Sequence, residues 1–439
     1  MSAPEAATTA EAAVPGPSRR RSLATVLGIV FLDLLGFGII IPILPFYVRS
    51  FGVSDVFIGL LAAAYSAMQF GFAPLLGRVS DERGRRPVLA LSLAGSAVAW
   101  VVFGLGAELR PSLGVVGALA AIFAARMLAG AMGGNIATAQ AYVTDITPTG
   151  DRANALGLVG AMFSLGFVFG PALGAVVASD AVVTAARSVL PAIVPATAFS
   201  LPSFLAAGMS FLALIATLVL LPEPDRQRQR THRRGVVAQF RAALADAALR
   251  PLVIVFLVFS IAFSGVTVAF VPFVADVYGF DAAAAGFLLT YIGVLGALNQ
   301  GVLVRILTRR YRAIQLAIGG AVVLVAALVV LPLAPIIGAA LPTALGPLVG
   351  LLVALAVLSA GNGLLSVGMT TLVSAAAGEN EQGGAFGVTQ GAGSLGRTIG
   401  PPVMTAIYVL AVWAPFLLAA VLTIGVVMLL HGIGRRVAT

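Results

Sequence analysis

Three ionisable residues lie inside long apolar stretches of this sequence, where a charged side chain is costly. Asp33 lies in the first stretch, and Arg126 and Arg397 lie in two later ones. An apolar environment makes a carboxyl hold its proton more tightly, whereas a nearby guanidinium favours the ionised form. We therefore predict Asp33 as a proton carrier and Arg126 as its partner. The alternatives are a permanent structural ion pair and an aspartate at a solvated helix end.

Arg397 has no obvious acid at its depth, so we predict that it lines a cavity and contacts a substrate. The alternative is a buried packing residue. Other amide and aromatic residues of the apolar stretches are further candidates for the cavity wall, although each also suits an interhelical hydrogen bond or core packing. The predicted cavity residues are Tyr65, Gln69, Asn135, Phe163, Tyr291, Asn299, Gln390 and Arg397.

An eight-residue phrase occurs twice. Residues 164–171 read Ser-Leu-Gly-Phe-Val-Phe-Gly-Pro, and residues 394–401 read Ser-Leu-Gly-Arg-Thr-Ile-Gly-Pro. This repeat predicts two homologous membrane-embedded halves with a site between them. The glycines permit close helix contact and the prolines bend the helix. The predicted packing residues are Gly166, Gly170, Pro171, Gly174, Gly400 and Pro401.

The composition indicates an integral membrane protein. Of the 439 residues, 60% are hydrophobic and only 10% are charged, and the apolar runs have the length of spanning helices. We predict an all-α membrane protein with twelve transmembrane helices in two pseudo-symmetric six-helix bundles. The expected spans are 23–48, 56–77, 87–107, 114–142, 152–178, 199–221, 251–275, 283–307, 313–335, 344–371, 384–408 and 411–433.

The polar segments set the predicted domain limits. We expect a disordered cytoplasmic N-terminus over 1–22, a six-helix bundle over 23–221, a cytoplasmic linker over 222–250 and a second bundle over 251–439. The first apolar run is too long for a signal peptide, so we expect it to be retained. On this model 21 of the 26 arginines face one side, which predicts cytoplasmic termini in a cell (inner or plasma) membrane.

Several function classes are excluded by what the chain lacks. All 26 basic residues are arginine, so there is no lysine for a P-loop or a Schiff base. Cysteine is absent, and neither histidine lies near a membrane centre, so we expect no metal and no cofactor. The net charge of +9 follows from the topology, so we expect no nucleic-acid partner. No nucleophile and base converge in sequence, so we expect no enzyme.

A short loop between the second and third spans carries an acid among four arginines. Residues 77–87 read Gly-Arg-Val-Ser-Asp-Glu-Arg-Gly-Arg-Arg-Pro, where the glycines permit a tight turn. This loop closely resembles motif A of the major facilitator superfamily, except that the family usually has a basic residue in place of Glu82. The resemblance implies that Gly77, Asp81, Gly84 and Arg85 form a conformational latch that holds an outward-open state. The alternative is a solvated turn.

Other segments extend the resemblance. Residues 126–130 are similar to motif B of that family, and residues 166–174 resemble motif C, which is associated with drug/proton antiporters. The first span, with Pro42 and Pro45, and the segments 68–74 and 141–147 resemble the twelve-span drug/proton antiporters, the tetracycline efflux group in particular. The likeness covers nearly the whole first half and part of the span near 384–408.

The resemblance implies that two bundles rock about a central cavity and that the chain is a monomer with protons, a small-molecule substrate and the lipid bilayer as partners. We predict proton-coupled export of small amphipathic compounds, with a tetracycline-like drug as the most specific guess. One alternative is a facilitator or proton symporter of a small metabolite, including an anionic one. An alternative from another class is a membrane receptor or scaffold that transports nothing.

Overall fold

The computed structural model describes residues 17–224, 236–377 and 382–438, and this part of the chain contains helices and no strand. Helices are expected where apolar side chains face lipid, because the backbone must satisfy its own hydrogen bonds there. The first half comprises α1 (Pro17–Ile40), α2 (Leu44–Ser50), α3 (Val56–Arg83), α4 (Arg85–Leu105), η1 (Gly106–Leu109), α5 (Arg110–Met132), α6 (Asn135–Ile146), η2 (Thr149–Asp151), α7 (Arg152–Val177), α8 (Asp180–Val189) and α9 (Ser200–Leu220).

A short helix, α10 (Val236–Ala245), lies in the predicted linker, and residues 225–235 of that linker fall outside the described part. The second half comprises α11 (Leu249–Tyr278), α12 (Ala282–Leu298), the π-helix η3 (Asn299–Val304), α13 (Arg305–Leu307), α14 (Ala313–Val330), η4 (Leu331–Leu333), α15 (Ala334–Ala339), α16 (Gly346–Ala376), α17 (Gln382–Leu410) and α18 (Ala414–Ala438).

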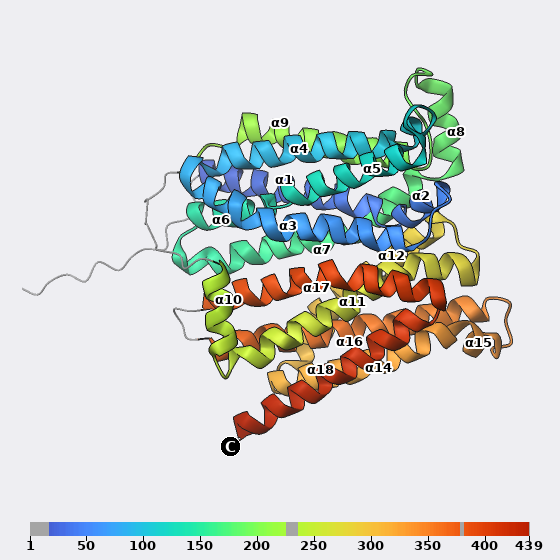
Figure 1. The fold of residues 1–439 in the computed structure, drawn as a ribbon. Helices are drawn as coiled ribbons and strands as arrows, with labels where there is room; N and C mark the ends of the chain where they lie inside the picture. The colour runs from blue at the N-terminus through green and yellow to red at the C-terminus, as the bar shows by residue number, and fades with distance from the viewer. Residues whose placement is uncertain (1–16, 225–235, 378–381, 439) are drawn as a thin grey trace, which may run out of the picture.

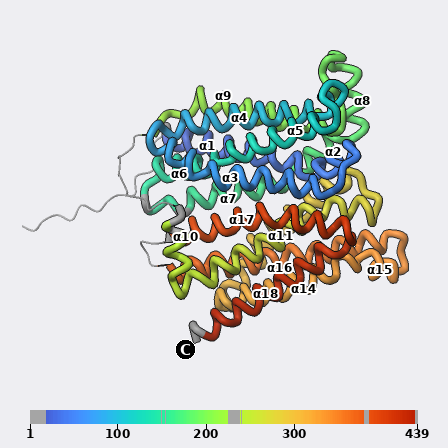
Figure 2. The backbone as a smooth tube through the Cα atoms, viewed as in Figure 1, coloured from blue at the N-terminus to red at the C-terminus, as the bar shows by residue number. Residues whose placement is uncertain are grey.

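The two halves lie side by side with their long helices running in the same general direction (Figure 1). Their internal contacts correspond: α1 packs on α7 as α11 packs on α17, and α4 packs on α9 as α14 packs on α18. The two halves meet mainly where α3 packs against α17 and where α7 packs against α12. The chain can be followed through both bundles in Figure 2. The predicted all-helical architecture of two related bundles is confirmed.

Ten stretches of the described chain are long and apolar enough to cross a membrane. One of them, Arg85–Ile146, includes the consecutive helices α4, α5 and α6. The glycine-rich helix α17 is not among the ten, although its 29 residues pack between α11 and α3. A multi-pass membrane protein is thereby confirmed, and the count of twelve spans stays a prediction.

The first predicted span differs from the structure at both ends. We expected disorder through residue 22, but α1 already begins at Pro17, and proline is well suited to a first helical turn. We also expected one helix over 23–48, but α1 ends at Ile40 and α2 begins at Leu44. Pro42 interrupts the helix because it has no N–H to donate.

Two of the predicted packing glycines lie at close contacts between helices. A Cβ added to Gly174 in α7 would lie 2.3 Å from the Ile39 carbonyl oxygen of α1. In the second half, a Cβ on Gly400 in α17 would lie 2.4 Å from the Ile261 carbonyl oxygen of α11. Because both neighbours are backbone atoms, neither position has room for a side chain.

We expect Gly174→Ala to lower the free energy of unfolding by about 1–3 kcal/mol, because α1 and α7 must move apart. Thermal unfolding of the detergent-solubilised protein measures the effect. Gly160→Ala in the same helix is the control, since nothing lies within 4 Å of a Cβ there. Equal stability of the two variants would contradict the packing assignment.

Candidate functional site

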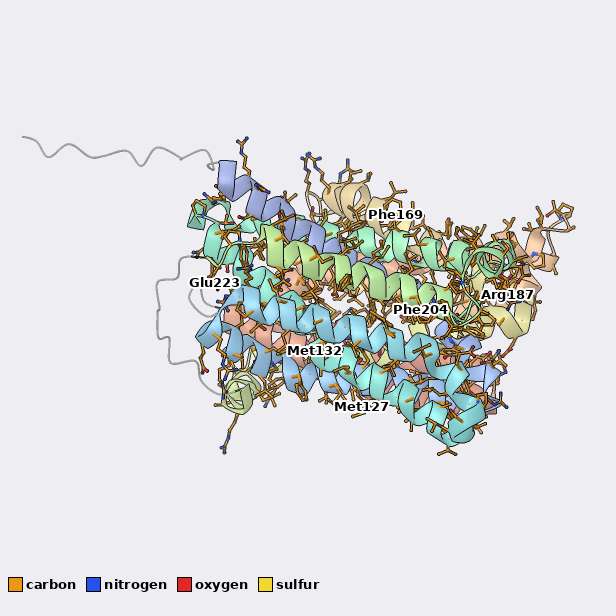
Figure 3. The ribbon with its side chains drawn as sticks, turned by 90° about the horizontal axis from the view of Figure 1, so that it is seen from above. Met127, Met132, Phe169, Arg187, Phe204 and Glu223 are labelled. Carbon is orange, nitrogen blue, oxygen red and sulfur yellow. The ribbon has the colours of Figure 1, made fainter. Side chains whose placement is uncertain are left out.

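A cavity of about 2290 Å³ lies between the two halves. The first half lines it with residues of α1, α3, α5, α6 and α7, and the second half with residues of α11 and α17. It extends from Pro45 and Ile58 to Asp81 near the end of α3 and Arg152 at the start of α7. These two helix ends lie at the end of the bundle where α1 begins and α18 ends (Figure 1). We call this the termini end. Glu223 lies at the termini end and Arg187 at the far end (Figure 3).

Most of the predicted site residues face this cavity. Its wall includes Asp33, Tyr65, Gln69, Arg126, Phe163, Gln390 and Arg397. We also expected Tyr291 and Asn299 of the second half to line it, but neither contributes to the wall. The Tyr291 hydroxyl donates to the Leu352 carbonyl at 3.2 Å, and the Asn299 amide donates to the Ser359 hydroxyl at 3.1 Å. Both residues join their helix to α16, so they make interhelical hydrogen bonds.

Asn135 is not part of the cavity wall either, although it lies next to Asp33. It is the first residue of α6, after the Gly133–Gly134 break that separates α6 from α5. The residue is 5% exposed and is a neighbour of the Asp33 carboxyl, and its Oδ1 atom has no hydrogen-bond partner among the described residues. Asn135, which we expected in the cavity wall, is therefore a buried residue next to Asp33.

Arg126 occupies an aromatic environment and forms no ion pair with Asp33 in this structure. Its guanidinium carbon lies 4.7 Å from the Tyr65 ring centroid, 5.8 Å from that of Trp100 and 6.0 Å from that of Phe37, which are cation–π distances. The residue is 5% exposed, and its Nε has no hydrogen-bond partner within the part of the chain that the structure describes. The partnership expected from the sequence is thus not a direct contact in this conformation.

Arg397 faces the cavity from α17 of the second half. Its Nη2 donates to the Ser394 hydroxyl at 2.7 Å, and no ion pair within the described part of the chain includes it. The matching residue of the first repeat, Phe167, also lies in the wall, and its ring centroid is 6.1 Å from that of Phe37. The repeats therefore present a guanidinium on one side and an aromatic ring on the other.

The predicted latch loop is tied together at the termini end. The Arg85 guanidinium donates to Asp81 at 2.6 Å and to Asp145 at 2.8 Å. Gly84 separates α3 from α4 with φ 124°, a left-handed value that favours glycine. The Glu223 carboxylate accepts from the backbone N–H groups of Arg85 and Arg86 at the start of α4, where a negative charge is stabilised. Sequence reasoning missed Asp145 and Glu223, which lie far from the loop in sequence.

A charged cluster joins the two halves at the far end. Arg49 in α2 donates to Asp55 at 2.8 and 2.6 Å and to Asp276 of α11 at 2.7 and 2.8 Å. The Tyr408 hydroxyl of α17 donates to Asp276 at 2.6 Å. Hydrogen bonds to Asp55 and Asp276 raise the pKa of Arg49 above its ordinary value. Asp276 lies in the last turn of α11 and is paired with both Arg49 and Tyr408.

The chain is similar to proteins that carry out membrane transport. A family model described as Major Facilitator Superfamily matches residues 26–351. Tetracycline resistance protein, class C, of Escherichia coli is 29% identical over 393 residues, covering 88% of this chain and 89% of that protein. Multidrug resistance protein 1 of Bacillus subtilis (strain 168) is 28% identical over 409 residues, covering 93% and 95%.

The fold is similar to that of solved transporters. The crystal structure of a bacterial homolog to the human lysosomal transporter Spinster, in an inward-facing and unoccupied conformation, has a TM-score of 0.75 and 15% sequence identity. The match covers 96% of this chain and 98% of that one.

Proposed function

The chain belongs to the major facilitator superfamily, and we propose that it exports small amphipathic compounds in exchange for protons, with a tetracycline-like drug as the most specific candidate. Its relatives of similar length include a tetracycline resistance protein and a multidrug resistance protein. Aromatic rings and amides in the cavity wall suit a substrate with an apolar body and polar groups.

One observation carries the proposal: the Asp33 carboxyl lies in the cavity wall, well inside α1. Every other carboxylate in the described part lies outside the helices or within four residues of a helix end. Placing a carboxyl at membrane depth is energetically unfavourable, so such a residue is ordinarily interpreted as functional. A group that faces an opening cavity can exchange its proton with water on whichever side is open.

The arginine distribution favours the cytoplasm for the termini end. The cavity wall includes the exposed Asp81 and Glu82 at that end, so we take this conformation as inward-open, with the Arg49 cluster closing the outer end. The latch contacts of Arg85 with Asp81 and Asp145 lie within the first half only, so they do not join the two halves there.

We propose the following cycle. Substrate enters the cavity and Asp33 releases its proton. After the halves rock and the substrate leaves, the carboxyl takes a proton from outside and the transporter resets.

Reconstituted vesicles test this function directly. We expect substrate addition to vesicles with an imposed pH gradient to release protons, reported by recovery of a quenched pH-sensitive fluorophore. A panel of tetracyclines, cationic dyes and neutral amphipathic drugs identifies the substrate class, and protein-free vesicles are the control. Proton flux that no member of the panel changes would contradict proton-coupled drug export, and would favour the receptor or scaffold alternative.

A second candidate function is proton symport of an acid-bearing metabolite, favoured by two guanidinium groups that have no carboxylate partner among the described residues. Arg126 and Arg397 both lie in the wall, and with Asp33 they act electrostatically on Tyr65. An anion bound beside Asp33 would favour the protonated carboxyl, so the anion and the proton would bind together and move in the same direction. The same vesicle assay distinguishes the two functions. In symport, the acidic solute and protons cross the membrane in the same direction, whereas in drug export they cross in opposite directions.

A further inference from the structure

We propose that the segment between α12 and α14 binds the headgroup of an anionic phospholipid. The inference goes beyond the transport cycle, because it concerns the outer surface of the second half and not the cavity. Four exposed arginines carry it, and none of them lines the cavity wall. They are Arg305, Arg309, Arg310 and Arg312.

The four arginines stand close together in a stretch of sequence without acids. They occupy four of the eight positions from 305 to 312, and the sequence has no aspartate or glutamate between Asp281 and Glu379. In the part of the chain that the structure describes, none of the four belongs to an ion pair. Like charges at this spacing repel one another, so an anion that binds among them relieves the repulsion.

The first half has a loop in the corresponding place, and its charges are compensated. In the loop between α3 and α4, Arg85 donates to Asp81 and Asp145, and the Glu223 carboxylate accepts from the backbone N–H of Arg85. Carboxylates of the protein therefore neutralise that loop. No carboxylate of the described chain does the same between α12 and α14.

The arginine segment lies at the termini end. Helix α14 begins beside the end of α18, since a Cβ on Gly434 would lie 3.3 Å from the Ile314 side chain, and α18 ends at the termini end (Figure 1). The arginine distribution favours the cytoplasm for this end. Anionic lipids give the cytoplasmic leaflet a negative surface potential, which attracts basic residues directly beside a membrane span.

An apolar stripe leads along the second half to these arginines. Leu298, Val302 and Ile306 follow one another at intervals of four residues, and each is more than half exposed. Arg305 and Arg309 flank Ile306 in the sequence. A phospholipid whose acyl chain lies along the stripe therefore has its phosphate at the level of the guanidinium groups. The stripe favours a lipid over a soluble anion, which would need only the charges.

The side chains suit a phosphate at a membrane surface. A planar guanidinium can donate two parallel hydrogen bonds to phosphate oxygens, which an ammonium group cannot do. Tyr311, which stands between Arg310 and Arg312, is 50% exposed. Its apolar ring and polar hydroxyl are typical of residues at the interface between lipid and water.

Contact quenching in vesicles tests the proposal without transport. The chain has no native cysteine, so Ile306→Cys carries a single bimane label on the stripe. Phosphatidylglycerol and phosphatidylcholine, each with a doxyl group near the headgroup end of an acyl chain, are compared as quenchers in phosphatidylcholine vesicles. We expect phosphatidylglycerol to reach half-maximal quenching at about a fivefold lower mole fraction, because the arginines concentrate it beside the label.

Two variants separate recognition of the headgroup from general contact with lipid. Arg305→Gln, Arg309→Gln and Arg310→Gln combined should make the two lipids quench equally. A label at Phe287→Cys, which is exposed on α12 towards the far end, should not distinguish the lipids even with all arginines present. If the triple variant does not insert into vesicles, Arg310→Gln alone replaces it and should reduce the preference about twofold.

Equal quenching by the two lipids with all arginines present would overturn the proposal, as would a preference that survives the glutamine substitutions. A preference that millimolar inorganic phosphate abolishes at constant ionic strength would assign the arginines to a soluble anion and overturn the lipid assignment. Each result is independent of the proposed function, since the label reports contact with lipid whether or not the cavity moves a substrate.

Discussion

Asp33→Asn should abolish proton-driven transport, reducing substrate-dependent proton flux to the level of protein-free vesicles. Asparagine has nearly the volume of aspartate and keeps a polar side chain, but it cannot ionise. No other carboxylate of the described chain lies so deep within a helix that lines the cavity. The loss should therefore be complete and specific to coupling. Substrate exchange across the membrane without a pH gradient should continue, because that exchange needs only the rocking of the loaded carrier.

Two further variants define the result. Asp33→Glu retains an ionisable group and should retain part of the flux. Glu108→Gln removes a carboxylate in η1, away from the cavity wall, and should transport like the wild type. Full proton-driven transport by Asp33→Asn would refute the assignment, and loss of both coupled flux and exchange would indicate a structural role.

The sequence predicted the deep charges because each interrupts a long apolar run, which is a local signal. Asp33, Arg126 and Arg397 all line one cavity, although they lie far apart in the chain. The amides were harder to place, because an isolated polar residue says little about which face of a helix meets the cavity. Asn135 and Asn299 looked equivalent in sequence, yet one lies next to the acid and the other bonds to α16.

Contacts between distant segments had no signature in the sequence. Arg49 and Asp276 are 227 positions apart, and each stands near a loop where a solvated charge is the ordinary expectation. The aromatic surroundings of Arg126 were hidden for the same reason, since Tyr65 and Trp100 come from two other helices. Such pairings depend on how the bundles pack, which local periodicity does not encode.

Asp276→Asn should open the far end more often, because Arg49 then loses one of the two carboxylates that it bridges. The pair is partly exposed, with Arg49 at 28% and Asp276 at 36%, so a simple surface ion pair would contribute little. Asp276, however, also accepts from Tyr408 and links three helices of both halves. Losing a charge-assisted hydrogen bond changes an equilibrium by about tenfold, and we expect a gain of that size in outward-open population.

The absence of native cysteine makes this population measurable. Thr267 is exposed in the cavity wall, so a Thr267→Cys reporter should react with a membrane-impermeant maleimide from the far side only when that end opens. We expect its labelling rate to rise about tenfold in Asp276→Asn, in proportion to the population. Asp281→Asn is the matched control, since Asp281 caps α12 through Ala284 at the same end without bridging the halves. Equal labelling of the two variants would show that the Arg49 cluster does not hold the far end closed.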